Sequence, residues 1–194
     1  SDYKNRYLDY ITADSKQCIG SFVFLWGQKQ ERTPTWYGVI LENGMNTESA
    51  QVMQYLWTGE WPINRVPSMS GLTINGLRAQ DSVQLIERDI CQADVITENP
   101  SGQALRYRWE IMAEVDKSVE SDGGDFEPSP EIIWSDSSET SSAKAQFAAP
   151  SAGEYRLFVY VEDTHGNAAT ANMPILVESM SFMDSVLHRI KKYF

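Results

Sequence analysis

The second half of the chain alternates apolar and polar residues in short runs. The alternation is clearest from Tyr155 to Val161, where every second side chain is apolar and we expect that face to form a core. Such runs recur at intervals of roughly 8–12 residues between turn residues, which is typical of an antiparallel β-sandwich. The expected strands are Leu72–Ile74, Ser82–Ile86, Cys91–Thr97, Leu105–Val115, Ile132–Ser135, Lys144–Phe147, Tyr155–Glu162 and Ala168–Val177.

The N-terminal part has a different pattern. Apolar residues at helical spacing predict helices over Tyr3–Ile11 and Thr47–Trp57, the second with Val52, Met53, Leu56 and Trp57 on its packing face. Cys18–Gly27 is a nearly continuous apolar and aromatic run, which is typical of a parallel strand buried on both faces. The polar, aromatic-bearing stretch Gln28–Gly38 is expected to be a loop.

Three units follow from these changes of pattern. The prolines in Glu60–Pro67 cannot continue a helix, so we expect a boundary there, with an α/β unit over residues 1–62 and the sandwich over 66–178. Residues 179–194 predict an amphipathic helix with a basic face. Two interpretations of that helix stay open: it docks on an acidic surface of the protein itself or of a sister subunit, or it binds a membrane surface.

Charge narrows the range of partners. The chain has 27 acidic and 16 basic side chains and a formal net charge of -11, which repels phosphate backbones and excludes nucleic acid as an expected partner. Neutral polysaccharides are compatible with this charge because hydrogen bonds and aromatic faces hold them. Cys18 and Cys91 fall in different units, so we expect free thiols. A disulfide between them stays an alternative only if the units pack closely.

One stretch of the first unit carries a family resemblance. Gly20–Gly38, which reads GSFVFLWGQKQERTPTWYG, resembles the eighth strand and following loop of barrel-type glycoside hydrolases with a family-2-like catalytic barrel. The resemblance implies that residues 1–62 are the end of a β/α barrel, with Tyr3–Ile11 and Thr47–Trp57 as its last two helices. Active sites of such barrels lie at the C-terminal ends of the strands.

The same resemblance implies a sugar subsite. Trp26 matches the aromatic residue that ends strand eight, where a flat indole suits the apolar face of a pyranose; packing at the barrel mouth is the other interpretation of Trp26. The substrate-binding residues implied are Trp26, Gln28, Gln30, Glu31, Arg32 and Trp36. Glycoside hydrolysis needs two carboxylates, which in the resembled family lie on strands four and seven, upstream of Ser1. We therefore expect no catalytic residue, cofactor or metal in this chain.

The sandwich carries a second resemblance. Leu105–Glu110 and Gly153–Asp163, followed by Gly166-Asn167, resemble bacterial immunoglobulin-like modules of the polycystic-kidney-disease (PKD) or cadherin-like kind, which follow catalytic domains in secreted polysaccharide enzymes. This implies a core role for Trp109 and a secreted or periplasmic protein whose signal peptide is not in this chain. The acidic group Asp122, Asp125 and Glu127 is interpreted either as a calcium cluster or, preferably, as a solvated loop.

Two functions from different classes follow. The chain is either the C-terminal region of a glycoside hydrolase or transglycosylase, with a polysaccharide or oligosaccharide and the rest of the parent barrel as partners. Alternatively, it is a non-catalytic immunoglobulin-like module that engages a polysaccharide, a membrane surface or a protein.

Overall fold

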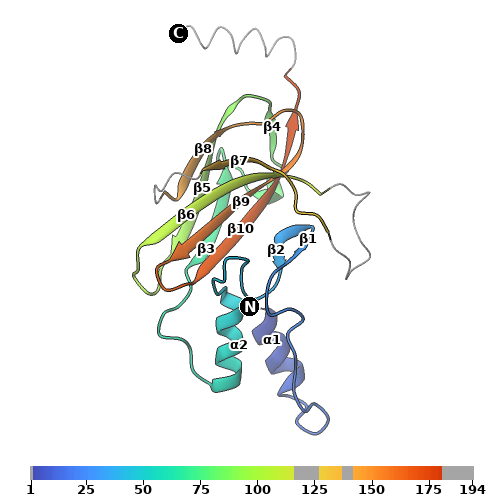
Figure 1. Ribbon diagram of the computed structural model, residues 1–194, viewed down its shortest axis with the longest axis vertical. Coiled ribbons are helices and arrows are strands. Elements are labelled where there is room, and N and C mark those ends of the chain that lie inside the picture. Colours follow the sequence, from blue (N-terminus) through green and yellow to red (C-terminus); the bar gives the residue numbers. More distant parts are fainter. Residues whose placement is uncertain (1, 116–126, 137–141, 181–194) are drawn as a thin grey trace.

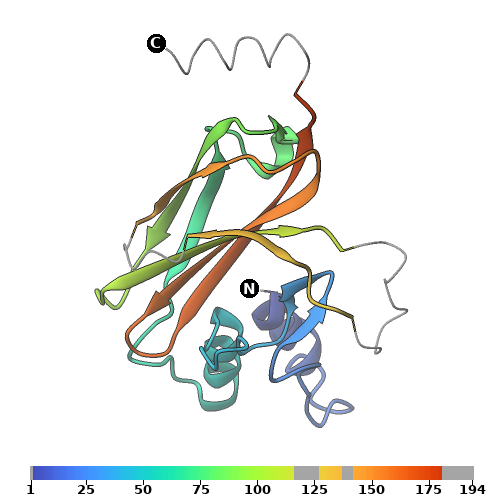
Figure 2. The ribbon, with the colours of Figure 1, turned by 45° about the horizontal axis from the view of Figure 1, so that its top comes forward.

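Two β-sheets packed face to face form the main body of the protein (Figure 1, Figure 2). The structure is a computed structural model that describes residues 2–115, 127–136 and 142–180. The larger sheet has the order β4 (Gln84–Ile86), β10 (Ala168–Glu178), β9 (Gly153–Asp163), β6 (Leu105–Ala113) and β7 (Ile132–Asp136). The smaller sheet has the order β3 (Ser68–Ile74), β5 (Ile90–Glu98) and β8 (Lys144–Ala148).

The connections between the sheets identify the type of sandwich. Neighbouring strands pair antiparallel except for β4, which runs parallel to β10. In chain order, β3, β5 and β8 form one sheet and face β6, β9 and β10 at the centre of the other. This is the arrangement of strands A, B and E against C, F and G in an immunoglobulin-like sandwich. The predicted sandwich class is confirmed.

Side-chain burial confirms the predicted core face of β9. Leu157, Val159 and Val161 are fully buried, and Trp109 of β6 is 1% exposed at the centre of the same core. The Trp109 indole Nε1 donates a hydrogen bond to the carbonyl of Ser142 over 3.3 Å. Burying a large ring whose polar atom is bonded stabilises the sandwich without leaving an unpaired donor.

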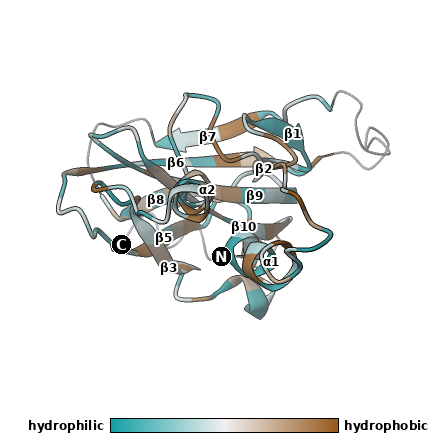
Figure 3. Cartoon of the chain, turned by 90° about the horizontal axis from the view of Figure 1, so that it is seen from below, coloured by the Kyte–Doolittle hydropathy of each residue, from teal (hydrophilic) through white to brown (hydrophobic). Residues whose placement is uncertain are grey.

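The helices of the N-terminal part also agree with the sequence pattern. The first consists of α1 (Asp2–Arg6) and a π-helical turn over Tyr7–Ile11, and the second is α2 (Glu48–Thr58). Helix α2 ends at Gly59, whose φ of 78° places it in the left-handed conformation that glycine adopts readily. Figure 3, seen from below, shows both helices end-on beneath the sandwich.

The predicted buried strand over Cys18–Gly27 is wrong for this chain. The segment is irregular, and its apolar side chains Ile19, Phe22 and Phe24 are 104%, 101% and 71% exposed. A strand needs a neighbour for its backbone groups, and within the described residues no strand pairs with this segment. The TIM-barrel fragment is therefore not formed as a barrel piece here.

The expected loop Gln28–Gly38 also needs correction. It contains an antiparallel hairpin of β1 (Lys29–Glu31) and β2 (Thr33–Tyr37), with Arg32 in the turn at a φ of 56°. The predicted C-terminal helix lies outside the described residues from residue 181 onward.

The N-terminal part packs on the outer face of the larger sheet. Met112, Phe158 and Tyr160 are buried on that face, with Leu41 packed against them. Asn46 forms a parallel bridge with Asn167 next to the β9–β10 turn. Strand β9 is consequently buried on both faces over most of its length, and cavities form where the two parts meet.

Candidate functional site

A groove lies where α2, the link after it and the β9–β10 turn come together. It has a volume of about 720 Å3, which falls within the roughly 300–1,000 Å3 of typical ligand pockets. Three tryptophans and a set of polar side chains dominate its wall: Trp26, Trp57, Trp61, Asn46, Gln54, Thr58, Asn64 and His165. Glu60 is the one carboxylate among the described residues that line it.

Trp26 and Trp57 form an exposed aromatic pair in this groove. Their ring centroids are 5.9 Å apart and the planes differ by 17°, so the two indoles are stacked with an offset. Trp26 is 48% exposed and Trp57 52% exposed. Helix α2 holds Trp57 near its last turn, and Trp26 reaches it from the irregular segment before the hairpin. The pair offers a flat apolar surface to solvent.

Trp61 is held more firmly than the other two. Its ring stacks on Tyr55 with centroids 4.4 Å apart and an interplanar angle of 12°, and the Arg65 guanidinium lies 3.8 Å from its centroid. Stacking and a cation–π contact restrict the ring to one orientation. The part of the groove lining that Trp61 contributes is therefore preorganised.

A buried polar network fixes the groove to the sandwich. Gln51 of α2 donates from Nε2 to Asn167 Oδ1 over 3.2 Å and to the Asn64 carbonyl over 2.8 Å. Its Oε1 accepts a hydrogen bond from the Val66 amide over 3.0 Å. Asn167 in turn donates from Nδ2 to Asp163 Oδ2 over 2.9 Å. Because Gln51 and Asn167 are each 4% exposed, these bonds hold α2 against the β9–β10 turn.

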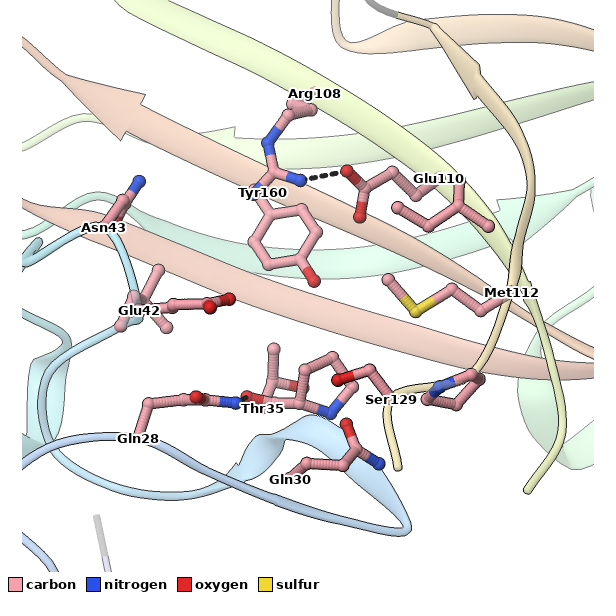
Figure 4. A pocket seen from close by; sticks show the side chains of 14 residues that line it. Gln28, Gln30, Thr35, Glu42, Asn43, Arg108, Glu110, Met112, Ser129 and Tyr160 are labelled. Atoms are coloured by element: carbon pink, nitrogen blue, oxygen red, sulfur yellow. Dashed lines mark hydrogen bonds and ion pairs between the residues drawn. The ribbon is translucent and has the colours of Figure 1, made fainter. Parts of the chain in front are cut away.

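The structure separates the six side chains expected to bind substrate. Only Trp26 lines the aromatic groove. Gln28 and Gln30 line a second cavity, shown in Figure 4. Arg32 and Trp36 lie at a third. Glu31 pairs with Lys29 over 2.9 Å. The hairpin causes this dispersal because successive side chains of a strand point to opposite faces.

The cavity of Figure 4 has mixed chemistry. It measures about 360 Å3 and lies between the hairpin, the loop near Glu42 and the outer face of β6 and β9. Arg108 pairs with Glu110 and places its guanidinium 3.7 Å from the Tyr160 ring centroid. Burial, followed by the nearby Glu110 carboxylate, raises the pKa of Tyr160 to about 12, so its hydroxyl stays protonated at neutral pH.

Glu127, which the sequence offered as a calcium ligand, instead bonds to other residues of the chain. Its carboxylate is 4% exposed and accepts hydrogen bonds from the Arg32 amide and from Gln30 Nε2. Asp122 and Asp125 lie outside the described residues. Over 2–115, 127–136 and 142–180, no group of three or more His, Cys, Asp or Glu is arranged to hold a metal ion. In the same ranges no helix is long and apolar enough to cross a bilayer.

The sequence pattern missed two members of the groove. Trp57 was assigned to the packing face of its helix, and the structure confirms burial of Val52 and Met53 while leaving Trp57 half exposed. Trp61 fell in the proline-containing link, where no periodicity could assign it a face. The only sequence signal for these two groove residues was composition, because Trp57 and Trp61 lie within five residues of each other, near Gln54 and Asn64.

Comparison with known proteins gives limited similarity. No family model and no curated protein matches the chain. Among solved structures, it is similar to the fibronectin(III)-like modules of Clostridium thermocellum CbhA, with 15% identity and a TM-score of 0.38 over 59% of this chain and 47% of that one. It is also similar to the PKD1 domain of Vibrio anguillarum Epp, with 14% identity and a TM-score of 0.33 over 60% of this chain and 98% of that one.

A third similar structure is larger. It is a nucleoside hydrolase-related hypothetical protein from Saccharophagus degradans that is associated with carbohydrate metabolism, with 17% identity and a TM-score of 0.38 over 68% of this chain and 30% of that one. The chain thus spans less than half the length of the CbhA structure and of the S. degradans structure. TM-scores below 0.5 carry no argument about function, and the sandwich assignment rests on strand order.

Proposed function

We propose that this chain is the C-terminal region of a carbohydrate-active enzyme, a glycoside hydrolase or transglycosylase, and that its aromatic groove binds an oligosaccharide or polysaccharide. The immunoglobulin-like sandwich supports the groove and the barrel end as an accessory domain. The observation that carries the proposal is the half-exposed stack of Trp26 and Trp57 over a groove lined with amide side chains.

The chemistry of the groove suits a neutral sugar. Aromatic faces pack against the C–H face of a pyranose, while Gln54, Asn46 and Asn64 can both donate to and accept from its hydroxyls. Carboxylates and cations are scarce along the wall. The polar groups of the wall can therefore replace most of the hydrogen bonds that a neutral ligand gives up to water when it binds. The net charge of -11 does not oppose a neutral ligand.

The exposed segment before the hairpin supports a parent barrel. Ile19, Phe22 and Phe24 expose apolar side chains, and no backbone–backbone hydrogen bond within the described residues involves residues 20–26. The segment forms no strand here, and on this proposal it pairs as one only where the rest of the parent protein supplies its neighbours. On this proposal the two catalytic carboxylates lie in that other part, and the enzyme is secreted or periplasmic, where polysaccharides are met.

The alternative function is a non-catalytic binding or assembly module. Its support is that Glu60 is the single carboxylate among the described residues of the groove, because hydrolysis of a glycoside requires two. The upstream sequence separates the two functions. A glutamate at the end of a preceding strand and another about three strands earlier favour the enzyme, and their absence contradicts it.

The sugar-binding part is tested by titrating tryptophan fluorescence with oligosaccharides of β-glucan, xylan, mannan and galactan. We expect saturable quenching by at least one series, weakened at least about tenfold, or about 1.4 kcal/mol, in Trp26→Ala and in Trp57→Ala. Trp36→Ala is the matched control, because Trp36 is 58% exposed and does not line the groove. Equal binding by all three variants would contradict the proposal.

The barrel part has its own measurement. In the isolated chain, hydrogen exchange of the Phe22–Leu25 amides should proceed at the rate of an unfolded peptide, because these amides have no backbone partner. In the full-length protein the same amides should be protected. Rapid exchange in both contexts would refute the barrel strand while leaving the sugar groove untouched.

A further inference from the structure

We propose that the cavity of Figure 4 is a second ligand site, distinct from the aromatic groove, which takes a small polyhydroxy amine such as an amino sugar. Its volume of about 360 Å3 lies at the lower end of the range for ligand pockets and suits one sugar ring. Both parts of the chain build it, since one wall comes from the hairpin and the loop at Glu42 and the other from β6 and β9.

The charge of the cavity favours a cation. Figure 4 shows the Glu42 carboxylate pointing into the cavity, and no hydrogen bond or ion pair of Glu42 is found in the described part of the chain. Arg108 is the cation of the lining, and its charge is balanced by Glu110. The exposed Glu42 carboxylate is therefore the acidic group of this lining that no described residue pairs, and an ammonium group bound beside it would form an exposed ion pair.

A buried hydrogen-bond acceptor in the cavity also favours a ligand that carries donor groups. Gln30 Oε1 is buried and has no partner among the described residues, while Nε2 of the same amide donates to Glu127. The Tyr160 hydroxyl points toward the cavity, and Ser129 lies opposite it (Figure 4). A ligand with several O–H and N–H groups would supply the donor that Gln30 Oε1 lacks, and an unpaired buried acceptor is costly.

Apolar side chains of the cavity suit the C–H face of a sugar ring. Met112, Ile132 and Leu41 line the cavity between the polar groups. Met112 is 7% exposed and belongs to the buried cluster of the outer sheet face. An anionic ligand would face Glu42 directly and is disfavoured.

The probes are glucosamine and glucose, which share a ring and differ by an ammonium in place of a hydroxyl at one carbon. Methionine labelled with 13C at its methyl group reports binding through the Met112 signal, which a Met112→Leu variant assigns. We expect glucosamine to shift this signal saturably and to bind at least about threefold more tightly than glucose, as for an exposed charge pair of somewhat under 1 kcal/mol.

Two variants complete the experiment. Glu42→Gln should bring glucosamine binding down to the level of glucose, whereas Glu154→Gln removes the same charge on β9 outside the cavity and should leave it unchanged. Trp26→Ala should also leave it unchanged, which keeps this site separable from the groove. Equal binding of both sugars, insensitivity to Glu42→Gln or no shift at Met112 would each overturn the proposal.

Discussion

Gln51 of α2 donates a hydrogen bond from Nε2 to Asn167 Oδ1 across 3.2 Å, and both side chains are almost completely buried. This bond joins two segments far apart in the sequence, a helix of the N-terminal part and the turn between the last two strands. Three further bonds of Gln51, to Asn64, Val66 and Arg65, tie the same side chain to the link between the two parts. Gln51 is therefore one buried side chain that couples the N-terminal part to the sandwich, alongside the Asn46–Asn167 bridge and the packing of Leu41 on the outer sheet face.

The first prediction concerns that coupling. Gln51→Ala leaves the Val66 amide and Asn167 Oδ1 without their partner, so we expect a loss of about 1–3 kcal/mol in the free energy of unfolding. Gln54→Ala is the matched control on the same helix, because Gln54 is exposed. Urea unfolding followed by circular dichroism measures both. Equal stability of the two variants would show that the network does not hold the parts together.

A second prediction tests the close approach of Gly27 and Gly38. A Cβ added to Gly38, whose φ is +99°, would lie 1.9 Å from the Gly27 carbonyl oxygen. Gly38→Ala should therefore destabilise the protein by about 1–3 kcal/mol and displace the segment that carries Trp26. Gly44→Ala has a similar φ of +83° with nothing within 4 Å, so it isolates the cost of the backbone angle.

The comparison of these two glycine variants is made by thermal unfolding. Gly38→Ala should melt at a clearly lower temperature than Gly44→Ala. If the two melt together, the close approach of the Gly27 carbonyl does not exclude a Cβ at position 38.

A third prediction concerns the corner before β9. The Tyr155 hydroxyl donates to the Ser151 carbonyl over 2.9 Å, four residues upstream, as the corner tyrosine of immunoglobulin-like domains does. Tyr155→Phe should cost about 0.5–1.5 kcal/mol of unfolding free energy. Tyr10→Phe is the control, because Tyr10 is 73% exposed. An unchanged urea midpoint in Tyr155→Phe would refute a structural role for this bond.

A fourth prediction distinguishes the two cysteines, both of which are free. Burial raises the pKa of the Cys91 thiol, which is 1% exposed, whereas Cys18 is only partly buried. The thiolate is the reactive form, so Ellman's reagent should modify Cys18 quickly and Cys91 only after unfolding. Cys18→Ser should leave the native protein unreactive. Rapid modification of two thiols would contradict the buried environment of Cys91.

The sandwich could be predicted because its signal is local. The run from Tyr155 to Val161 in β9 places apolar residues at every second position, so the face that holds Leu157 and Val161 follows from the sequence. The position of Trp109 in the core came from a resemblance and agrees with its burial. The second buried face of β9 was not predictable, because the segment that covers Tyr160 lies more than 100 residues earlier.

The N-terminal part shows where local reasoning stops. An apolar run such as Cys18–Gly27 has the composition of a buried strand, but a strand forms only where a partner supplies its backbone bonds. The candidate site depended on long-range packing in the same way. Trp26 could be chosen from the sequence, whereas its stacking partner Trp57 required knowledge of how α2 folds back toward the hairpin.

On the proposed function, the stacked pair of Trp26 and Trp57 binds a neutral sugar chain. The most direct measurement is the NMR titration of the six tryptophan indole N–H signals with the oligosaccharide series that quenches fluorescence. We expect saturable shifts of the Trp26 and Trp57 signals, while the signal of Trp109, bonded to Ser142 inside the core, stays fixed. Shifts confined to Trp36, or no shift at Trp26 and Trp57 with any series, would contradict it.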